Sequence, residues 1–336
     1  MPLIYAGIDE AGYGPLLGPL CVGCAVFEVR NWTDGEPAPD LWNLLSRAVC
    51  RETRDKRHRI AIDDSKKLKL ANSVSTRHPL IHLERGVLSF LGCLADAQPV
   101  STDLDLFLRT GASRPDRPWY AGDPAPCPVG STPGEIAIAR SSLAGTLEHS
   151  GVALHALHCD VLGEVEFNEL VHAAGTKAAT TEAALVKHLW TIWEKWGSVG
   201  AQAGEGVRVV CDRQGGRTQY TDMLQRAFPD ATVIATHESP TQSRYELRAR
   251  ERAGGERHMH VLFLTESEQQ HLPVALASML AKYTREMLMA RFNRYWCARM
   301  PELKPTAGYR NDGWRWLEDA RAVISEGERG AMIRRA

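Results

Sequence analysis

The N-terminal stretch LIYAGIDEAGYGPLLGPLCVGCAVF constrains this chain more than any other part of its sequence. An apolar run ends on the adjacent carboxylates Asp9 and Glu10, and a loop with three glycines precedes a second apolar run. This pattern predicts two strands joined by a glycine-rich turn. Because neighbouring carboxylates repel and their burial costs several kcal/mol, they are either solvated turn residues or ligands of a metal ion.

Composition excludes several classes of protein. The 336 residues carry a formal net charge of −1, so the chain is not a globally basic nucleic-acid binder, and a site for a polyanion has to be a local patch. No apolar run approaches the roughly 20 residues of a membrane span, and the N-terminus lacks the features of a signal peptide. We expect a cytoplasmic protein with no membrane association, in which Cys21 and Cys24 are buried reduced thiols.

Hydrophobic periodicity predicts a mixed-sheet α/β domain without internal repeats. The expected strands have period-two or continuous apolar runs and lie at 3–9, 18–29, 59–64, 151–162, 207–212, 231–238 and 261–264. The expected helices have a spacing of three to four residues and lie at 40–50, 181–196, 218–228, 272–296 and 312–324.

Two segments do not fit this alternation of strands and helices. The Pro- and Gly-rich segment 97–135 is expected to be an insertion or a long surface excursion, because it has few periodic apolar residues. A charged block at about 240–260 is interpreted as a second insertion. It is either a backbone-binding arm rich in arginine or a solvated hairpin whose glutamates balance the arginines.

Acidic residues follow three of the expected strands. Asp9 and Glu10 end the first, Asp212 ends the strand 207–212, and Glu266 and Glu268 follow the run VLFL. Ligand sites of open α/β sheets gather at the carboxyl ends of strands. Several carboxylates there suit Mg²⁺ or Mn²⁺, and two such ions can promote hydrolysis of a phosphodiester. The alternative is that these acidic residues only cap strands and begin helices.

Five motifs occur in an order that resembles the type 2 ribonuclease H family, which comprises ribonucleases HII and HIII. The motifs are GIDEAGYGPLLGP, DDSKKL at 63–68, CDRQGG at 211–216, ESEQQHLPVALASMLAKYTRE at 266–286 and AGYRNDGWRWL at 307–317. The resemblance implies an RNase H-like fold, a mixed sheet flanked by helices. It also implies an endonuclease that hydrolyses RNA in RNA/DNA hybrids, or ribonucleotides embedded in duplex DNA, and leaves a 3′-hydroxyl and a 5′-phosphate.

The resemblance also assigns the catalytic residues. Asp9, Glu10, Asp212 and Glu268 match the acidic residues that hold two Mg²⁺ or Mn²⁺ ions during catalysis. A glutamate at position 268 is the residue of ribonuclease HIII, whereas ribonuclease HII has aspartate. Glu286 is a reserve candidate, with a surface ion pair as its alternative role.

Other matched positions imply substrate contacts. These residues come from the glycine loop, the basic motif, the long helix and the C-terminal motif: Gly12, Tyr13, Gly14, Lys66, Lys67, Ser278 and Tyr309. Tyr13 departs from the family, which has arginine between the two glycines, and this puts affinity and junction preference in question. Tyr309 matches the tyrosine that stacks on the sugar at an RNA–DNA junction.

The resemblance predicts a catalytic domain over residues 1–300, with insertions at about 97–135 and 240–260, and a C-terminal helical segment at 301–336 that completes the substrate site. We expect a monomer whose partner is nucleic acid and whose role lies in DNA replication or repair. Two alternatives remain: a catalytically drifted nucleic-acid-binding relative, or another RNase H-fold nuclease such as a junction resolvase. The preference between a single ribonucleotide and a long hybrid is open.

Overall fold

The structure, a computed structural model, describes residues 2–95, 98–202, 206–213, 217–250 and 255–335. The strands are β1 Leu3–Ala11, β2 Leu20–Val29, β3 Val49–Cys50, β4 Ile60–Ala61, β5 Val152–Leu162, β6 Val207–Asp212, β7 Thr232–Glu238, β8 Gln242–Arg250 and β9 Glu256–Leu264. The helices are α1 Leu41–Leu44, α2 Ser65–Leu68, α3 Ile81–Leu91, α4 Asp103–Thr110, α5 Pro133–His149, α6 Glu164–Ala174, α7 Ala178–Gln202, α8 Thr221–Ala227, α9 Leu272–Arg299, α10 Arg310–Asp319 and α11 Glu326–Met332, with short 3₁₀ turns η1 Pro118–Tyr120 and η2 Ser267–Gln269.

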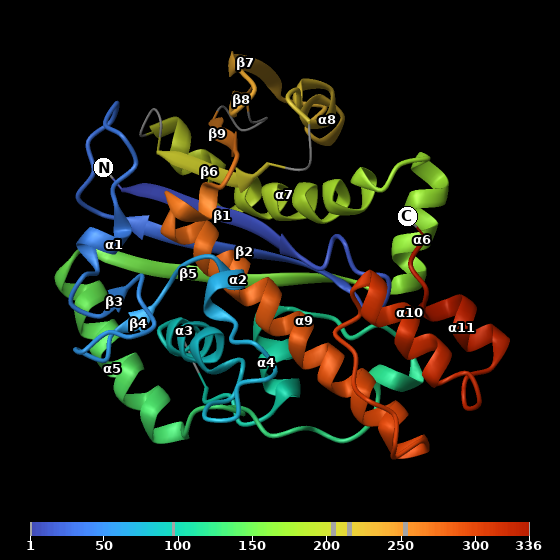
Figure 1. Cartoon of the computed structure of the whole chain (residues 1–336). Helices are drawn as coiled ribbons and strands as arrows, with labels where there is room; N and C mark the ends of the chain where they lie inside the picture. Colours follow the sequence, from blue (N-terminus) through green and yellow to red (C-terminus); the bar gives the residue numbers. More distant parts are fainter. Residues whose placement is uncertain (1, 96–97, 203–205, 214–216, 251–254, 336) are drawn as a thin grey trace.

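Seven strands form one mixed sheet in the order β5-β2-β1-β6-β9-β8-β7 (Figure 1). β1 pairs antiparallel with β2, which confirms the expected N-terminal hairpin, and it pairs parallel with β6, which in turn pairs parallel with β9. The carboxyl ends of β1, β6 and β9 therefore meet at one edge of the sheet. This mixed sheet with helices on both faces confirms the predicted α/β class.

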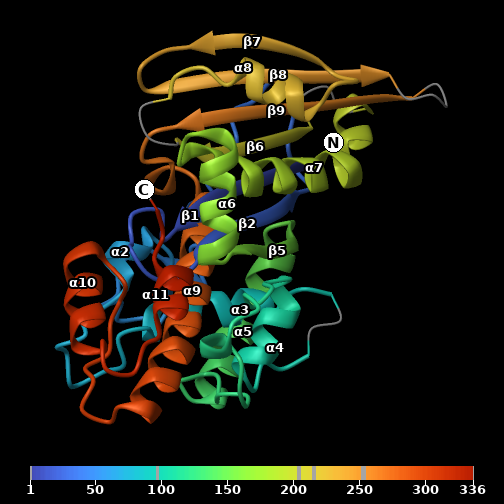
Figure 2. The same cartoon turned by 90° about the vertical axis from the view of Figure 1, so that its right-hand side faces the viewer.

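Alternation along β1 divides the interior into two cores, one on each face of the sheet. Leu3 and Tyr5 belong to the core beneath α9, whereas Ile4 and Ile8 belong to the core beneath α7. Figure 2 shows the sheet with these helices packed against it. α9 lies so close to β1 that a Cβ atom at Gly7 would approach the carbonyl carbon of Pro273 to 2.2 Å. A residue without a side chain is therefore required there.

The described residues of the segment 97–135, residues 98–135, do not form a loop confined to the surface, so of its two alternatives the long surface excursion is wrong. It contains α4, η1 and the start of α5, and it packs against α9. Trp119 is buried, with its ring centroid 6.1 Å from that of Trp296. Asp103 and Arg291 form a buried ion pair with an Oδ2–Nε distance of 2.6 Å. A few large side chains therefore anchor this irregular segment without any periodic pattern.

One further prediction needs correction. The helix expected over 40–50 ends at Leu44, and β3 pairs with β4 in a separate two-stranded parallel sheet, because tertiary pairing overrides the local periodicity.

The charged block at 240–260 forms β8 and most of β9, an antiparallel pair, which agrees with the hairpin alternative and joins the main sheet. Its apolar side chains, such as Leu247 and Met259, are buried on the α7 face, while charged ones alternate with them. Residues 251–254 and 214–216, the last part of the motif CDRQGG, lie outside the described residues.

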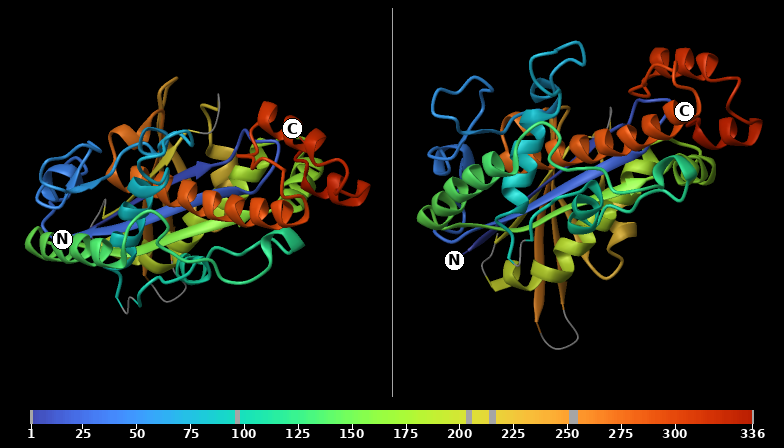
Figure 3. Two further views of the ribbon diagram at one scale, coloured as in Figure 1. Left: turned by 60° about the horizontal axis from the view of Figure 1, so that its bottom comes forward. Right: turned by 90° about the horizontal axis from the view of Figure 1, so that it is seen from below.

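The C-terminal segment packs against the second half of α9. Trp316 of α10 is buried, with its ring centroid 4.9 Å from that of Phe292. In Figure 3 the C-terminal helices, coloured red, lie beside the end of α9. None of the helices in the described part of the chain is long and apolar enough to cross a membrane.

Candidate active site

A cavity of about 250 Å³ lies at the edge of the sheet where β1, β6 and β9 end. All four acidic residues proposed from the sequence line it, and they come from three separate elements. They are Asp9 and Glu10 of β1, Asp212 of β6 and Glu268 of η2. The pairing of Ile8 with Cys211 in the parallel register of β1 and β6 places Asp9 and Asp212 side by side.

Short local contacts fix the orientation of these carboxylates. The Glu10 backbone N–H donates to Asp9 Oδ1 at 2.7 Å. The Ser267 hydroxyl, in the turn after β9, donates to Asp212 Oδ1 at 3.1 Å. Ser278 of α9 also lines the cavity, and its hydroxyl bonds to that of Ser65 at 3.0 Å. Strand ends, one turn and one helix thus build the site together.

The environment of the cavity disfavours the ionised forms of the four carboxyl groups. Burial raises the pKa of Asp9 well above its usual range, and the charges of Glu10 and Asp212 raise it further. Burial and then Asp212 raise the pKa of Glu10 to about 7, while Lys66 opposes the shift. Burial is also the main cause of the raised pKa values of Asp212 and Glu268. The site therefore concentrates negative charge that little in the chain neutralises.

The donor set fits a hard divalent cation. The four acidic residues offer only carboxylate oxygens, which Mg²⁺ and Mn²⁺ prefer, and a cation among them would stabilise the ionised forms that burial disfavours. Glu286 does not line the cavity, because it pairs with Lys282 at an Oε1–Nζ distance of 2.8 Å. This contact supports an ion-pair role for Glu286 rather than a role among the catalytic carboxylates.

Two lysines line the cavity. Lys66 follows Asp64, which caps α2 by accepting the Lys66 N–H at 2.9 Å, and both residues line the cavity. Lys282 also lines it and donates to the Tyr309 hydroxyl at 3.3 Å. Lys67 points elsewhere, since its ammonium pairs with Asp63 at 3.3 Å and it does not line the cavity.

An arginine near the C-terminus stabilises the glycine loop through hydrogen bonds to its backbone. The guanidinium of Arg334 is buried and donates to the carbonyls of Gly12 and Tyr13, the latter at 3.0 Å. Gly12 has a φ of 93°, which favours glycine. A Cβ at Gly14 would meet no heavy atom within 4 Å, so this part of the loop is open to a ligand.

The loop also contacts the C-terminal motif through the backbone. The N–H groups of Leu16 and Leu17 donate to the carbonyl of Gly308 at 2.8 and 3.0 Å. These bonds place Tyr309, which is 48% exposed, at the rim of the cavity. At Tyr13, where the family has arginine, Lys177 lies over the ring at 4.9 Å from its centroid. A cation is thus present beside the loop although residue 13 is not basic.

Several lining residues were not proposed as site residues from the sequence. Asp64 and Ser65 belong to the motif DDSKKL and directly precede Lys66. This position next to a proposed substrate contact could have identified them as site residues. Lys282 lies four residues after Ser278, so helical spacing puts both on one face of α9. Arg334 does not line the cavity but holds its glycine loop, and no pattern in the sequence indicates it, because its contacts are made more than 300 residues away along the chain.

Comparisons with known proteins give likeness at the level of structure. No family model and no curated protein matches the sequence. Solved structures of ribonucleases H of types HII, H2 and HIII align with nearly the whole chain.

Three of these structures illustrate the range. Ribonuclease HII of Archaeoglobus fulgidus, in a complex with PCNA, is 14% identical, with 99% of this chain and 94% of that chain covered and a TM-score of 0.40. Ribonuclease H2 of Pyrococcus horikoshii OT3 is 14% identical, with coverages of 98% and 97% and a TM-score of 0.39. Bst-RNase HIII in complex with Mn²⁺ is 15% identical, with coverages of 99% and 66% and a TM-score of 0.39. Likenesses this distant carry no argument about activity or site residues.

Proposed function

We propose that this chain is a metal-dependent endoribonuclease of the RNase H type, acting on RNA in RNA/DNA hybrids or on ribonucleotides embedded in duplex DNA. One observation carries the proposal. The four carboxylates of the sequence motifs, the glycine loop, two lysines and an exposed tyrosine all line one cavity. A structural role does not explain why four carboxylates with raised pKa values are kept together.

The roles of the residues follow from their places. Asp9, Glu10, Asp212 and Glu268 would hold two Mg²⁺ or Mn²⁺ ions. When bound, such ions supply an activated water and stabilise the leaving oxygen of an in-line displacement at phosphorus. The products of this hydrolysis are a 3′-hydroxyl and a 5′-phosphate.

The remaining lining residues suit the substrate backbone. Lys66 and Lys282 place point charges in the same cavity as the carboxylates, where they would attract the phosphates flanking the scissile bond. The open space at Gly14 lets a nucleic-acid backbone approach the loop closely. The exposed face of Tyr309 would stack on a sugar, and contact with the 2′-hydroxyl would distinguish ribose from deoxyribose.

A cleavage assay tests this proposal. The substrates are two end-labelled duplexes, one with a single ribonucleotide in DNA and one with a long RNA strand on DNA, each with Mg²⁺, Mn²⁺ or EDTA. Metal-dependent cutting of either duplex with a 5′-phosphate product is the expected result, and the preferred duplex defines the substrate. If neither duplex is cut while both are bound, the chain is a nucleic-acid-binding relative and the proposal fails.

A further inference from the structure

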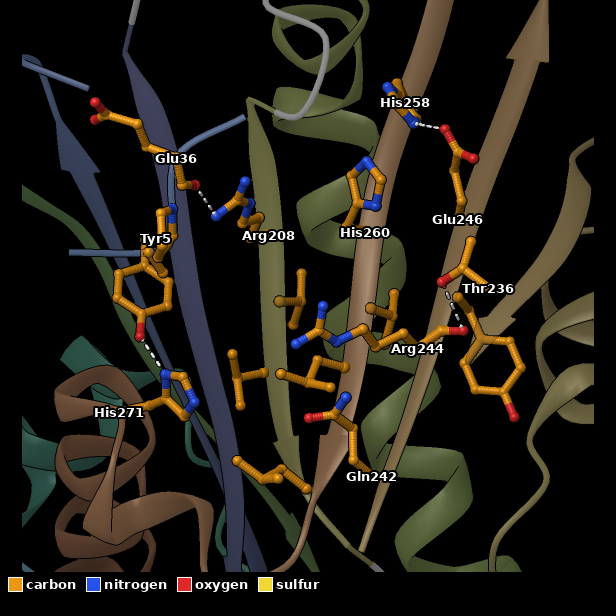
Figure 4. A pocket seen from close by; sticks show the side chains of 18 of the residues that line it. Tyr5, Glu36, Arg208, Thr236, Gln242, Arg244, Glu246, His258, His260 and His271 are labelled. Atoms are coloured by element: carbon orange, nitrogen blue, oxygen red, sulfur yellow. Dashed lines mark hydrogen bonds and ion pairs between the residues drawn. The ribbon is translucent and has the colours of Figure 1, made fainter. Parts of the chain in front are cut away.

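A second, larger cavity lies on the same sheet, away from the carboxylates. α9 packs mainly against β1 and β2, and beside it the same face of β6, β9 and β8 forms the floor of a cavity of about 850 Å³ (Figure 4). Tyr5, from the core beneath α9, lines one wall, and its hydroxyl bonds to His271 Nδ1 at 2.5 Å. Polar and charged side chains line this floor, among them Arg244, Glu246 and His260.

Two histidines and a glutamate converge on this floor. His258 and His260 are two residues apart on β9, so their side chains project from the same face of the sheet. Glu246 of β8 is the direct cross-strand partner of His260. The ligand atoms of all three lie within 4.8 Å of one another, and the two imidazole rings are 4.6 Å apart. Strand register alone therefore brings them together.

The distances allow a metal ion to enter with small movements. His258 Nε2 and Glu246 Oε1 are 2.5 Å apart. Ligand atoms at about 2.1 Å from a tetrahedral Zn²⁺ lie roughly 3.4 Å from each other, so changes of about 1 Å in side-chain position suffice. Both elements are paired strands of the main sheet, which holds the three Cα positions in place.

The neighbouring arginines do not block the site. Arg248 bonds to the carboxylate only through Oε1, at 2.6 Å from its Nε, and its side chain is 62% exposed, so it can remain as a partner of the ligand or turn into solvent. Arg208 is held by the carbonyl of Glu36 at 2.7 Å and stacks over the ring of Trp32.

We propose that Glu246, His258 and His260 form a binding site for a divalent transition metal of the Zn²⁺ class, with its open coordination position in the large cavity. Two imidazoles with one carboxylate favour such metals over Mg²⁺ or Ca²⁺. Three protein ligands with one open position are typical of a zinc site that binds a further ligand rather than a purely structural site.

This site is separate from the acidic cavity. Along β6 and β9, Arg208 pairs with His260 and Asp212 with Leu264, so the two sites are four positions apart along the strands, about 13 Å. The two sites also differ in chemistry, since the acidic residues of the first cavity offer only carboxylate oxygens whereas this site offers two imidazoles. The proposal does not depend on the ribonuclease activity, and it is tested without measuring that activity.

The experiment is a titration of the untagged full chain with Zn²⁺, followed by calorimetry, and with Co²⁺, followed by its visible absorption. The test variant is the double substitution His258→Asn and His260→Asn. The variant Asp212→Asn is included to distinguish metal bound at the acidic cavity from metal bound by the histidines. The matched control is His155→Asn on β5, because His155 also pairs with a glutamate, Glu28, at 2.8 Å but has no second histidine.

We expect one class of Zn²⁺ site in the wild type to weaken at least about 100-fold in the double variant, because even outer partners of a ligand contribute 10- to 100-fold. The Co²⁺ bands typical of nitrogen-ligated tetrahedral metal should vanish in the same variant. Both signals should persist in Asp212→Asn and His155→Asn. The proposal is overturned if the wild type gives no imidazole signature in X-ray absorption of bound Zn²⁺, or if the double variant keeps that signature while its circular dichroism is unchanged.

Discussion

The replacement Glu10→Gln should stabilise the metal-free protein while abolishing its proposed activity. Glu10 lies beside Asp9 and Asp212 in the acidic cavity, and its pKa rises from an ordinary 4.5 to about 7. A folded-state pKa above the unfolded value means that the fold favours the protonated carboxyl. The resulting cost is absent below pH 4.5, grows as the pH rises to 7 and is constant above.

The magnitude follows from the size of the shift. One pKa unit corresponds to about 1.4 kcal/mol, so ionised Glu10 costs the fold at most roughly 3 kcal/mol, less where solvent reaches the side chain. Glutamine has nearly the same shape and no charge. The free energy of unfolding of the variant should therefore exceed that of the wild type by about 2–3 kcal/mol at pH 8 and by little at pH 4.5.

The assay is urea unfolding in EDTA at both pH values, with Glu28→Gln on β2 as the control, since Glu28 is outside the cavity and pairs with Arg30 and His155. Added Mn²⁺ should stabilise the wild type more than Glu10→Gln. A variant that gains no stability at pH 8, or gains as much at pH 4.5, would refute the argument that the carboxylates repel one another in the fold.

Three other substitutions give sharp expectations. Gly7→Ala should destabilise the protein by about 3 kcal/mol in thermal unfolding, because its Cβ would lie 2.2 Å from helix backbone atoms; a neutral effect would contradict the close packing of α9. Gly14→Ala should change the unfolding free energy by under about 0.5 kcal/mol, since open space surrounds it, yet it should slow cleavage if the substrate approaches there. Arg334→Ala should lower the free energy of unfolding by about 2–4 kcal/mol and raise KM, because it leaves the carbonyls of the glycine loop without their donor. Unchanged stability and KM would show that the loop keeps its conformation without Arg334.

The sequence predicted most of what positions the acidic cavity. The apolar runs that precede Asp9 and Asp212 are local signals, and the parallel pairing of their strands brings the carboxylates together. The helix that carries Ser278 was also predictable, because its apolar residues extend over a long stretch without a break. These features depend on neighbours in the sequence and on general rules of strand and helix packing.

Other features depend on contacts that no local pattern shows. Trp119 is buried by α9, far away in the sequence, so the Pro-rich segment that carries it resembles a surface loop. Charged residues obscure the strand pattern of β8 and of the first part of β9 in the sequence, because one face of each strand is open to the large cavity. Arg334 reaches the glycine loop from the other end of the chain. In each case tertiary packing decides the outcome.

The measurement that tests the central claim most directly is cleavage of the two labelled duplexes, in Mn²⁺, by Asp9→Asn. The matched control is Asp160→Asn on β5. The Asp160 carboxylate pairs with Lys187 and lies outside the cavity. We predict that the wild type and Asp160→Asn cut, and that Asp9→Asn is slower by at least about 100-fold while it remains folded by circular dichroism. Cutting by Asp9→Asn at the wild-type rate would contradict the assignment of these carboxylates as the metal-binding catalytic centre.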